Sequence, residues 1–206
     1  MSDVHDRLVR ARLDSPLAAP LVTELSDFYA ARYADYGGFD QPANTPPELE
    51  LYPPLLFTPP YGELVLIVRD GRAIAGGAFM YLDPTTAEIK RVWTSSQHRR
   101  QGLSRRIMAA LEEAIIERGY RNAYLSTGPR QPEAVALYRS LGYTPLFDTT
   151  VDPESIGALA FEKVLAPDNA GPRLRGPLDA LRGARQRRAL RRTHKFRPRP
   201  GRRLGD

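Results

Sequence analysis

The sequence contains no cysteine, and this absence excludes disulfide bonds, thiolate zinc sites and a cysteine nucleophile. Its three histidines, His5, His98 and His194, are isolated and form no metal-ligand spacing, so we expect no metal site. The longest strongly apolar run, Leu64–Val68, is far too short to cross a bilayer. Residues Met1–Asp14 lack the apolar segment of a signal peptide. These absences predict a soluble, cytoplasmic protein with no membrane span.

Two common glycine-rich phosphate signatures are also missing, since no GxGxxG and no GxxxxGK[ST] run occurs. One other stretch suits a phosphate. A predicted strand, Ala87–Thr94, leads through an arginine-rich junction into a predicted helix from Leu103 to about Arg118. A helix start presents free N–H groups, Gly102 lets the backbone turn sharply, and the arginines add positive charge. The junction therefore predicts a phosphate cradle, with a solvated basic helix cap as the alternative.

This junction reads Arg99-Arg100-Gln101-Gly102-Leu103-Ser104 and resembles the (R/Q)xxGx(G/A) motif of the GCN5-related N-acetyltransferases, the GNAT superfamily. It departs from the motif at Ser104, which replaces a glycine or alanine. A second block, Leu125–Tyr143, resembles the later GNAT motif, in which a strand, an Asn or Gln and a helix ending in LYxxxG(F/Y) follow one another. The resemblance covers roughly Leu17–Leu165. It implies an α+β GNAT (acyl-CoA N-acyltransferase) fold: a mixed, mostly antiparallel sheet with splayed central strands, flanked by helices.

The resemblance also implies that acetyl-CoA is the co-substrate. Its pyrophosphate would be wrapped by the junction, to which we assign Arg99, Arg100, Gln101, Gly102, Leu103, Ser104 and Arg105. Val92, Trp93 and Thr94 would offer backbone groups to the pantetheine arm and the thioester carbonyl. A bulge in their strand, as the family has, would splay it from a second strand, Asn122–Thr127. Gln131 stands where the family often has a cofactor-contacting Asn, although an ordinary polar helix-start residue fits nearly as well.

Two residues are candidates for proton transfer. The family places a tyrosine near the CoA sulfur, and the match assigns this role to Tyr138 as the acid that protonates the departing thiolate. Its alternative is a core aromatic, because Tyr138 has helical spacing from other apolar residues. Glu88 resembles a catalytic base of the histone-acetyltransferase branch; the alternative is a solvent-facing carboxylate that pairs with Lys90 or Arg91.

The remaining chain supplies further elements of a ββββαβαββ-like pattern. We expect a helix from Ser15-Pro16 to about Asp35, a Pro-rich connection Phe39–Gly62 that shapes the acceptor site, and a short helix around Pro47–Tyr52. Glu63–Asp70 and Arg72–Leu82 are predicted to form a hairpin. Asn122–Thr127 is predicted to be a strand and Pro132–Leu141 a helix, and two final strands are predicted over Tyr143–Asp148 and Leu159–Leu165.

Charge divides the chain into a domain, residues 1–165, with a net charge of −4, and a basic tail, residues 166–206, with a net charge of +10. The tail has a linker composition at its start, a basic segment Pro177–Thr193 that could form a short helix, and a disordered end. It is either a weak, non-specific nucleic-acid contact or an appendage without a partner.

The main functional prediction is an acetyl-CoA-dependent N-acetyltransferase that acts on a primary amine of a small molecule or a peptide, by direct attack in a ternary complex. The alternatives are a non-catalytic acyl-CoA-binding module of the same fold and a nucleic-acid-associated protein that acts through its tail. A homodimer formed through edge strands also stays open.

Overall fold

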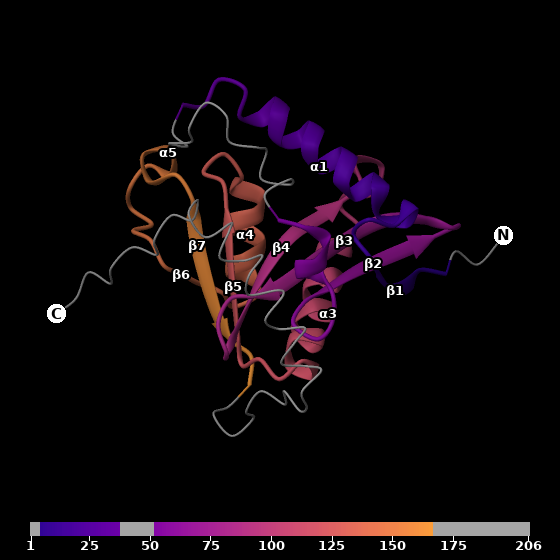
Figure 1. The fold of residues 1–206 in the computed structure, drawn as a ribbon. Coiled ribbons are helices and arrows are strands. Elements are labelled where there is room, and N and C mark those ends of the chain that lie inside the picture. The colour runs from indigo at the N-terminus through magenta and orange to yellow at the C-terminus, as the bar shows by residue number, and fades with distance from the viewer. Residues whose placement is uncertain (1–4, 38–51, 167–206) are drawn as a thin grey trace.

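A mixed seven-stranded sheet organises the computed structural model, which describes residues 5–37 and 52–166 (Figure 1). The strands follow the order β1-β2-β3-β4-β5-β7-β6, and every neighbouring pair is antiparallel except β4 and β5. Their bounds are β1 Arg7–Ala11, β2 Glu63–Arg69, β3 Arg72–Tyr81, β4 Thr86–Thr94, β5 Asn122–Thr127, β6 Thr144–Pro145 and β7 Leu159–Val164. The predicted α+β class with a mostly antiparallel sheet is confirmed.

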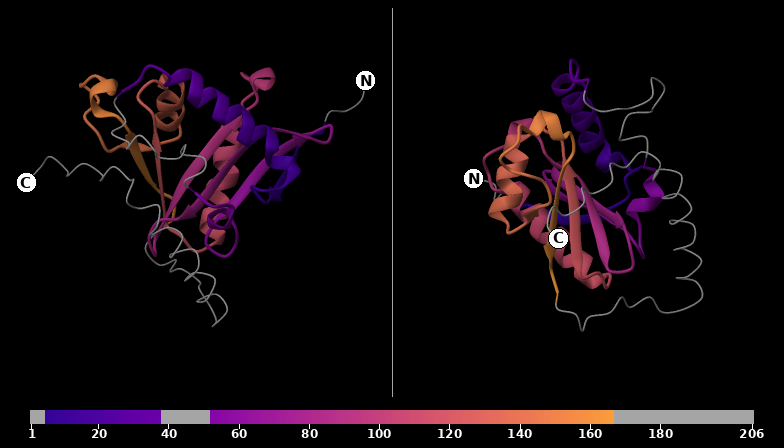
Figure 2. Two further views of the ribbon diagram at one scale, coloured as in Figure 1. Left: turned by 45° about the horizontal axis from the view of Figure 1, so that its top comes forward. Right: turned by 90° about the vertical axis from the view of Figure 1, so that its left-hand side faces the viewer.

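Helices cover both faces of this sheet (Figure 2). Helix α3 packs on β2, β3 and β4, and α1 packs on β3 and β4. The helices are α1 Ala19–Arg32, α3 Leu103–Glu117, α4 Pro132–Ser140 and α5 Pro153–Ile156, with 3-10 turns η1 Pro16–Ala18, η2 Pro54–Phe57 and η3 Ser96–His98. In both figures α1 runs from the end of β4 toward α4, so it crosses from one half of the sheet to the other.

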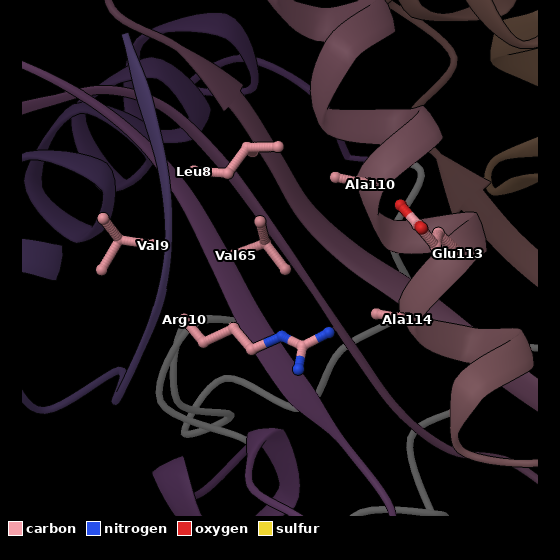
Figure 3. A pocket seen from close by; sticks show the side chains of 7 residues that line it. All are labelled: Leu8, Val9, Arg10, Val65, Ala110, Glu113 and Ala114. Atoms are coloured by element: carbon pink, nitrogen blue, oxygen red, sulfur yellow. The ribbon is translucent and has the colours of Figure 1, made fainter.

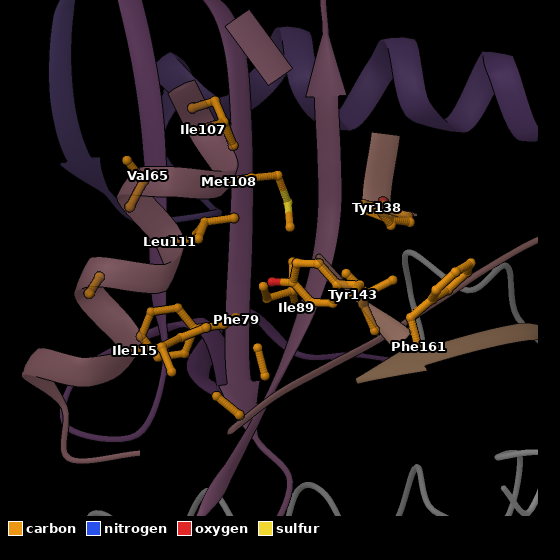
Figure 4. Packing of buried hydrophobic residues seen from close by; sticks show 14 of the residues in the cluster. Val65, Phe79, Ile89, Ile107, Met108, Leu111, Ile115, Tyr138, Tyr143 and Phe161 are labelled. Carbon is orange, nitrogen blue, oxygen red and sulfur yellow. The ribbon is translucent and has the colours of Figure 1, made fainter. Parts of the chain in front are cut away.

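Two apolar cores form because side chains alternate along the strands. On β2, Val65 and Ile67 enter the core that α3 and α4 cover, whereas Leu64 and Leu66 enter the core that α1 and η2 cover. The first core is drawn in Figure 4, where residues of α3 lie beside Phe79 and Ile89, and Phe161 lies on the other side of Tyr143. A sheet covered on both faces explains why β2 and β3 read as almost continuous apolar runs.

The predicted bulge lies in β4. Its pairing with β3 passes from Trp93 opposite Gly76 to Lys90 opposite Ala78, so two β4 residues oppose the single residue Gly77. One of these two, Arg91, has a φ of 60°, in the left-handed region. A two-for-one mismatch of this kind bends the strand and increases its twist.

Beyond the bulge, β4 and β5 part. They pair in parallel from Thr86 opposite Asn122 to Ile89 opposite Leu125, and the pairing ends there. Strand β5 continues beside β7 as far as Thr127, while β4 continues beside β3 as far as Thr94. The predicted splay of the central strands is therefore confirmed.

The structure also departs from the sequence-based predictions. Strand β1 and helix α5 were not predicted, and the predicted strand Tyr143–Asp148 is reduced to Thr144–Pro145. The predicted short helix around Pro47–Tyr52 lies almost wholly outside the described residues; the 3-10 turn that follows it is Pro54–Phe57. The tail from residue 167 onward also lies outside them. Within the described ranges, no helix has the length and apolarity needed to span a membrane.

Candidate functional site

The predicted phosphate cradle lies between the end of β4 and the start of α3. Gly102 is the N-cap of α3 with a φ of 72°, and Arg100 has a φ of 61°, so the chain turns sharply through two left-handed residues. This conformation favours glycine at position 102. A Cβ added there would meet no protein atom within 4 Å, so open space adjoins the turn. The N–H of Arg106 donates to the Gly102 carbonyl (3.2 Å), and the amides before it precede the intrahelical ladder.

The side chains of the junction divide into two groups. Arg99 and Arg100 are exposed, and within the described residues they form no ion pair. Arg105, in contrast, donates to the Ser140 hydroxyl at the end of α4 (2.8 Å). The Gln101 side-chain oxygen accepts from Arg69 (3.0 Å). The junction thus offers two guanidinium groups that are unpaired among the described residues, while Gln101 and Arg105 hold the turn against its neighbours.

Arg69 also links the turn to the start of the chain. Its guanidinium binds both oxygens of Asp6, and Arg106 of α3 binds the same carboxylate. Hydrogen bonds from Arg69 and Arg106 lower the pKa of Asp6 from 3.8 to about 2. Asp6 is therefore ionised at neutral pH and ties the N-terminal segment, the end of β2 and α3 together.

The predicted pantetheine segment, Val92–Thr94, lies where β4 has left β5. Trp93 is buried, and its indole N–H donates to Glu24 of α1 (3.2 Å). The Thr94 hydroxyl is buried without a hydrogen-bond partner among the described residues. Glu24 was not predicted. A single glutamate on a helix reads as a solvent-facing residue, so the sequence carries no signal for this contact.

Tyr138 lies in the core on α4, with its ring 6.0 Å from that of Tyr143 and 5.7 Å from that of Phe161 (Figure 4). Burial raises the pKa of its hydroxyl well above the usual value, and the Tyr29 hydroxyl of α1 adds to this shift. The packing alternative for Tyr138 is therefore correct as far as its ring is concerned. The hydroxyl stays protonated at neutral pH, which is the state that an acid requires.

Gln131 lies in a hydrogen-bonded chain that joins β5, α4 and α1. Its side-chain oxygen accepts from Thr127 (3.0 Å), and its nitrogen donates to the Tyr33 hydroxyl (3.2 Å). A Cβ on Gly128 would lie 2.0 Å from that hydroxyl, so a glycine is needed for Tyr33 to approach. The structure thus gives the Gln131 side chain two contacts within the protein.

Glu88 is 3% exposed, so the prediction of a solvent-facing carboxylate is wrong, because both faces of the sheet are covered. The predicted pairing with Lys90 is present at 3.6 Å. The Lys90 ammonium lies 4.4 Å above the Tyr52 ring, and Glu88 is opposite Tyr124 in the β4–β5 register. Glu88 therefore lies where the strands are still paired, in a buried cluster of charged and aromatic groups.

A separate cavity of about 300 Å³ lies between β1 and α3 and is lined by Leu8, Val9, Arg10, Val65, Ala110 and Glu113, among others (Figure 3). None of the predicted site residues lines it. Within the described ranges, no cluster of three or more His, Asp or Glu side chains could hold a metal ion.

Comparison with known proteins gives a consistent family. A sequence profile of the acetyltransferase (GNAT) family matches residues 24–143. The uncharacterized N-acetyltransferase YsnE of Bacillus subtilis (strain 168) is 34% identical over 93 residues, which are 42% of this chain and 62% of that protein. The chain thus spans less than two thirds of this curated relative.

Two solved structures share the fold. An acyl-CoA N-acyltransferase from Klebsiella pneumoniae has a TM-score of 0.58 at 23% identity, covering 80% of this chain and 100% of that one. A GNAT acetyltransferase from Elizabethkingia anophelis, solved with acetyl-CoA bound, has a TM-score of 0.50 at 14% identity, covering 77% and 97%.

Proposed function

Because the chain belongs to the acetyltransferase (GNAT) family, we propose that it transfers an acetyl group from acetyl-CoA to a primary amine of a small molecule or a peptide. The observation that carries this proposal is the parting of β4 and β5 beside the exposed start of α3. The space between the parted ends of β4 and β5, called the acetyl-CoA slot below, would give an extended thioester access to main-chain groups of β4. The start of α3 would favour the phosphates of CoA.

The junction would hold the pyrophosphate. The first amides of α3 and the side chains of Arg99 and Arg100 would supply its donors, with Gly102 providing the turn and the open space beside it. The main chain of Val92–Thr94 is free of β5 and would pair with the pantetheine arm. Arg105 and Gln101 would act here through their backbone, because their side chains are bound to Ser140 and Arg69.

The proposed reaction is a direct attack in the ternary complex. The neutral amine attacks the thioester carbonyl, the new C–N bond forms and the C–S bond breaks. Tyr138 gives its proton to the departing thiolate, and the proton that the amine loses goes to Glu88, so that the products are the amide and the CoA thiol. Burial raises the pKa of Tyr138, which keeps the phenol protonated at neutral pH but also makes it a weaker acid toward the thiolate.

The experiment that tests the proposal is a CoA-thiol release assay over a panel of amines, amino acids, polyamines, aminoglycosides and peptides. With an accepted amine, Tyr138→Phe should lower kcat by about 10²- to 10⁴-fold. Its acetyl-CoA affinity, measured by calorimetry, should stay within about twofold of wild type, because the ring remains in place. Glu88→Gln in the same assay should lower kcat and shift the acidic limb of its pH profile.

Tyr143→Phe is the matched control, because it removes the hydroxyl of a buried tyrosine from the same core without touching the proposed proton path. Its kcat should equal that of wild type. Absence of thiol release with every amine, together with tight acetyl-CoA binding, would favour a non-catalytic acyl-CoA module. A Tyr138→Phe variant with full kcat would exclude Tyr138 as the acid.

A further inference from the structure

Glu24 of α1 lies outside the predicted site and holds the end of β4 through several hydrogen bonds. Its two oxygens accept from the Trp93 indole N–H (3.2 Å), the Ser95 hydroxyl (3.2 Å) and the Ser96 backbone N–H (3.0 Å). Hydrogen bonds to a carboxylate are stronger than those between neutral groups. Glu24 lies between Leu21 and Leu25, whose side chains are buried and anchor α1 on the sheet.

These three donors belong to the segment where support from β5 has ended. The β4–β5 pairing stops at Ile89, and the ladder with β3 ends as the Ser95 N–H donates to the Ile74 carbonyl (2.9 Å). After Ser96 the chain enters η3 and the turn that leads to Gly102. On the side where β5 no longer pairs with β4, Glu24 therefore supports this part of β4 and the start of the turn.

We propose that Glu24 is a positioning residue for acetyl-CoA binding. It holds Trp93, Ser95 and Ser96 so that the free edge of β4 and the turn before α3 keep their relative geometry in the absence of substrate. This inference rests on the proposed function of the same slot. Because the support comes from α1, it also connects the acetyl-CoA slot to the helix that crosses to α4.

A carboxylate-to-amide pair of variants isolates this role. Glu24→Gln keeps the size of the side chain but removes its charge and replaces one of the two accepting oxygens by an NH2 donor. Asp27→Asn is the matched control, because it makes the same change three residues later on α1, at an exposed side chain with no hydrogen bond or ion pair to the described residues. Ser95→Ala removes a single bond and should give a smaller effect in the same direction.

Trp93 reports on the contact itself, since it is the single tryptophan of the chain and its indole donates to Glu24. The acetyl-CoA affinity at an unchanged melting temperature is the readout that a merely structural role would not move. Acetyl-CoA binding is measured by calorimetry, Trp93 emission by fluorescence and folding by thermal melting. Glu24→Gln should shift Trp93 emission and weaken acetyl-CoA binding about 10-fold, from the loss of charge-assisted hydrogen bonds. Asp27→Asn should match wild type in emission and in affinity.

The outcomes separate the two proposals. Wild-type protein that does not bind acetyl-CoA would overturn the proposed function, and the inference with it. Wild type that binds, with Glu24→Gln equal to Asp27→Asn in affinity and emission, would overturn the role of Glu24 alone. If Glu24→Gln melts early, Ser95→Ala decides: unchanged affinity in that folded variant would count against the proposal.

Discussion

The neighbouring strands β4 and β5 are held together by different means at their two ends. At the closed end, four parallel residue pairs from Thr86 to Ile89 join the strands; Ala87 and Ile89 are buried in the core on one face, and Glu88 is buried on the other. There the Tyr120 hydroxyl donates to the Tyr61 carbonyl (2.8 Å) in a cluster of aromatic rings. At the open end, no β4–β5 backbone pairing is described, and side chains of the helices and turns bridge the gap.

Those bridges come from several helices. Glu24 joins α1 to β4, Gln131 joins α4 to Tyr33, and Arg105 joins α3 to Ser140. Arg32 of α1 adds an ion pair with Glu133 and a bond to the Arg130 carbonyl (2.7 Å). Burial thus stabilises the closed end. At the open end, polar contacts between the helices, β4 and the turns fix the geometry of the region where we propose that the substrate binds.

The largest expected effect is on folding, from a cavity at the closed end. Ile89→Ala removes a 2% exposed side chain at the last β4–β5 pair and should lower the free energy of unfolding by about 2–5 kcal/mol. Urea denaturation measures it, and Ile89→Val should cost about 0.5–1.5 kcal/mol. If the closed end contributes to stability and not to binding, the acetyl-CoA affinity of the folded Ile89→Ala protein stays near that of wild type. A large loss of affinity without a loss of stability would contradict this division.

A smaller effect is expected from overpacking at the open end. Gly128→Ala would place a Cβ 2.0 Å from the Tyr33 hydroxyl and should cost about 1–3 kcal/mol, because Tyr33 must leave Gln131. Turnover in the thiol-release assay should fall as well, since α1 loses one of its contacts with the start of α4. In a Tyr33→Leu background the same substitution should cost much less, and equal costs in both backgrounds would refute the clash.

The smallest expected effect depends on pH. Asp6 has a pKa of about 2 in the folded protein against 3.8 ordinarily, so it stabilises the fold above pH 4 and loses this contribution as pH falls toward 2. Asp6→Asn should therefore lower the unfolding free energy by about 1 kcal/mol at pH 7, a value reduced by solvent screening. Thermal melts of both proteins should converge near pH 2, and a difference that grows on acidification would contradict the assignment.

The sequence predicted the elements whose patterns are local. The fourfold apolar spacing of α3 and the apolar runs of β2 and β3 placed these elements within about a residue of their observed bounds. Strand β1 was missed because Arg7–Ala11 has an arginine at positions 7 and 10 and an exposed Leu8, and only pairing with β2 makes it a strand.

The backbone features of the site were predicted from the sequence, whereas most of its side-chain contacts were not. The turn at Gly102, the bulge in β4 and the parting from β5 follow from motifs, and the structure contains all three. The burial of Glu88, the Gln101–Arg69 contact and the three bonds of Glu24 depend on residues distant in sequence. Such contacts leave no periodicity, so sequence patterns give the position of a residue and not the direction of its side chain.

The extra residue at Arg91–Val92 changes which face each later β4 side chain meets. Before it, Ala87 and Ile89 enter the core beneath α3; after it, Val92 enters that core and Trp93 turns to the α1 side. In an unbroken strand, Trp93 would share the face of Ile89 and could not reach Glu24. One extra residue thus shifts the alternation of the strand, and this shift places the indole of Trp93 on the α1 face, where it donates to Glu24.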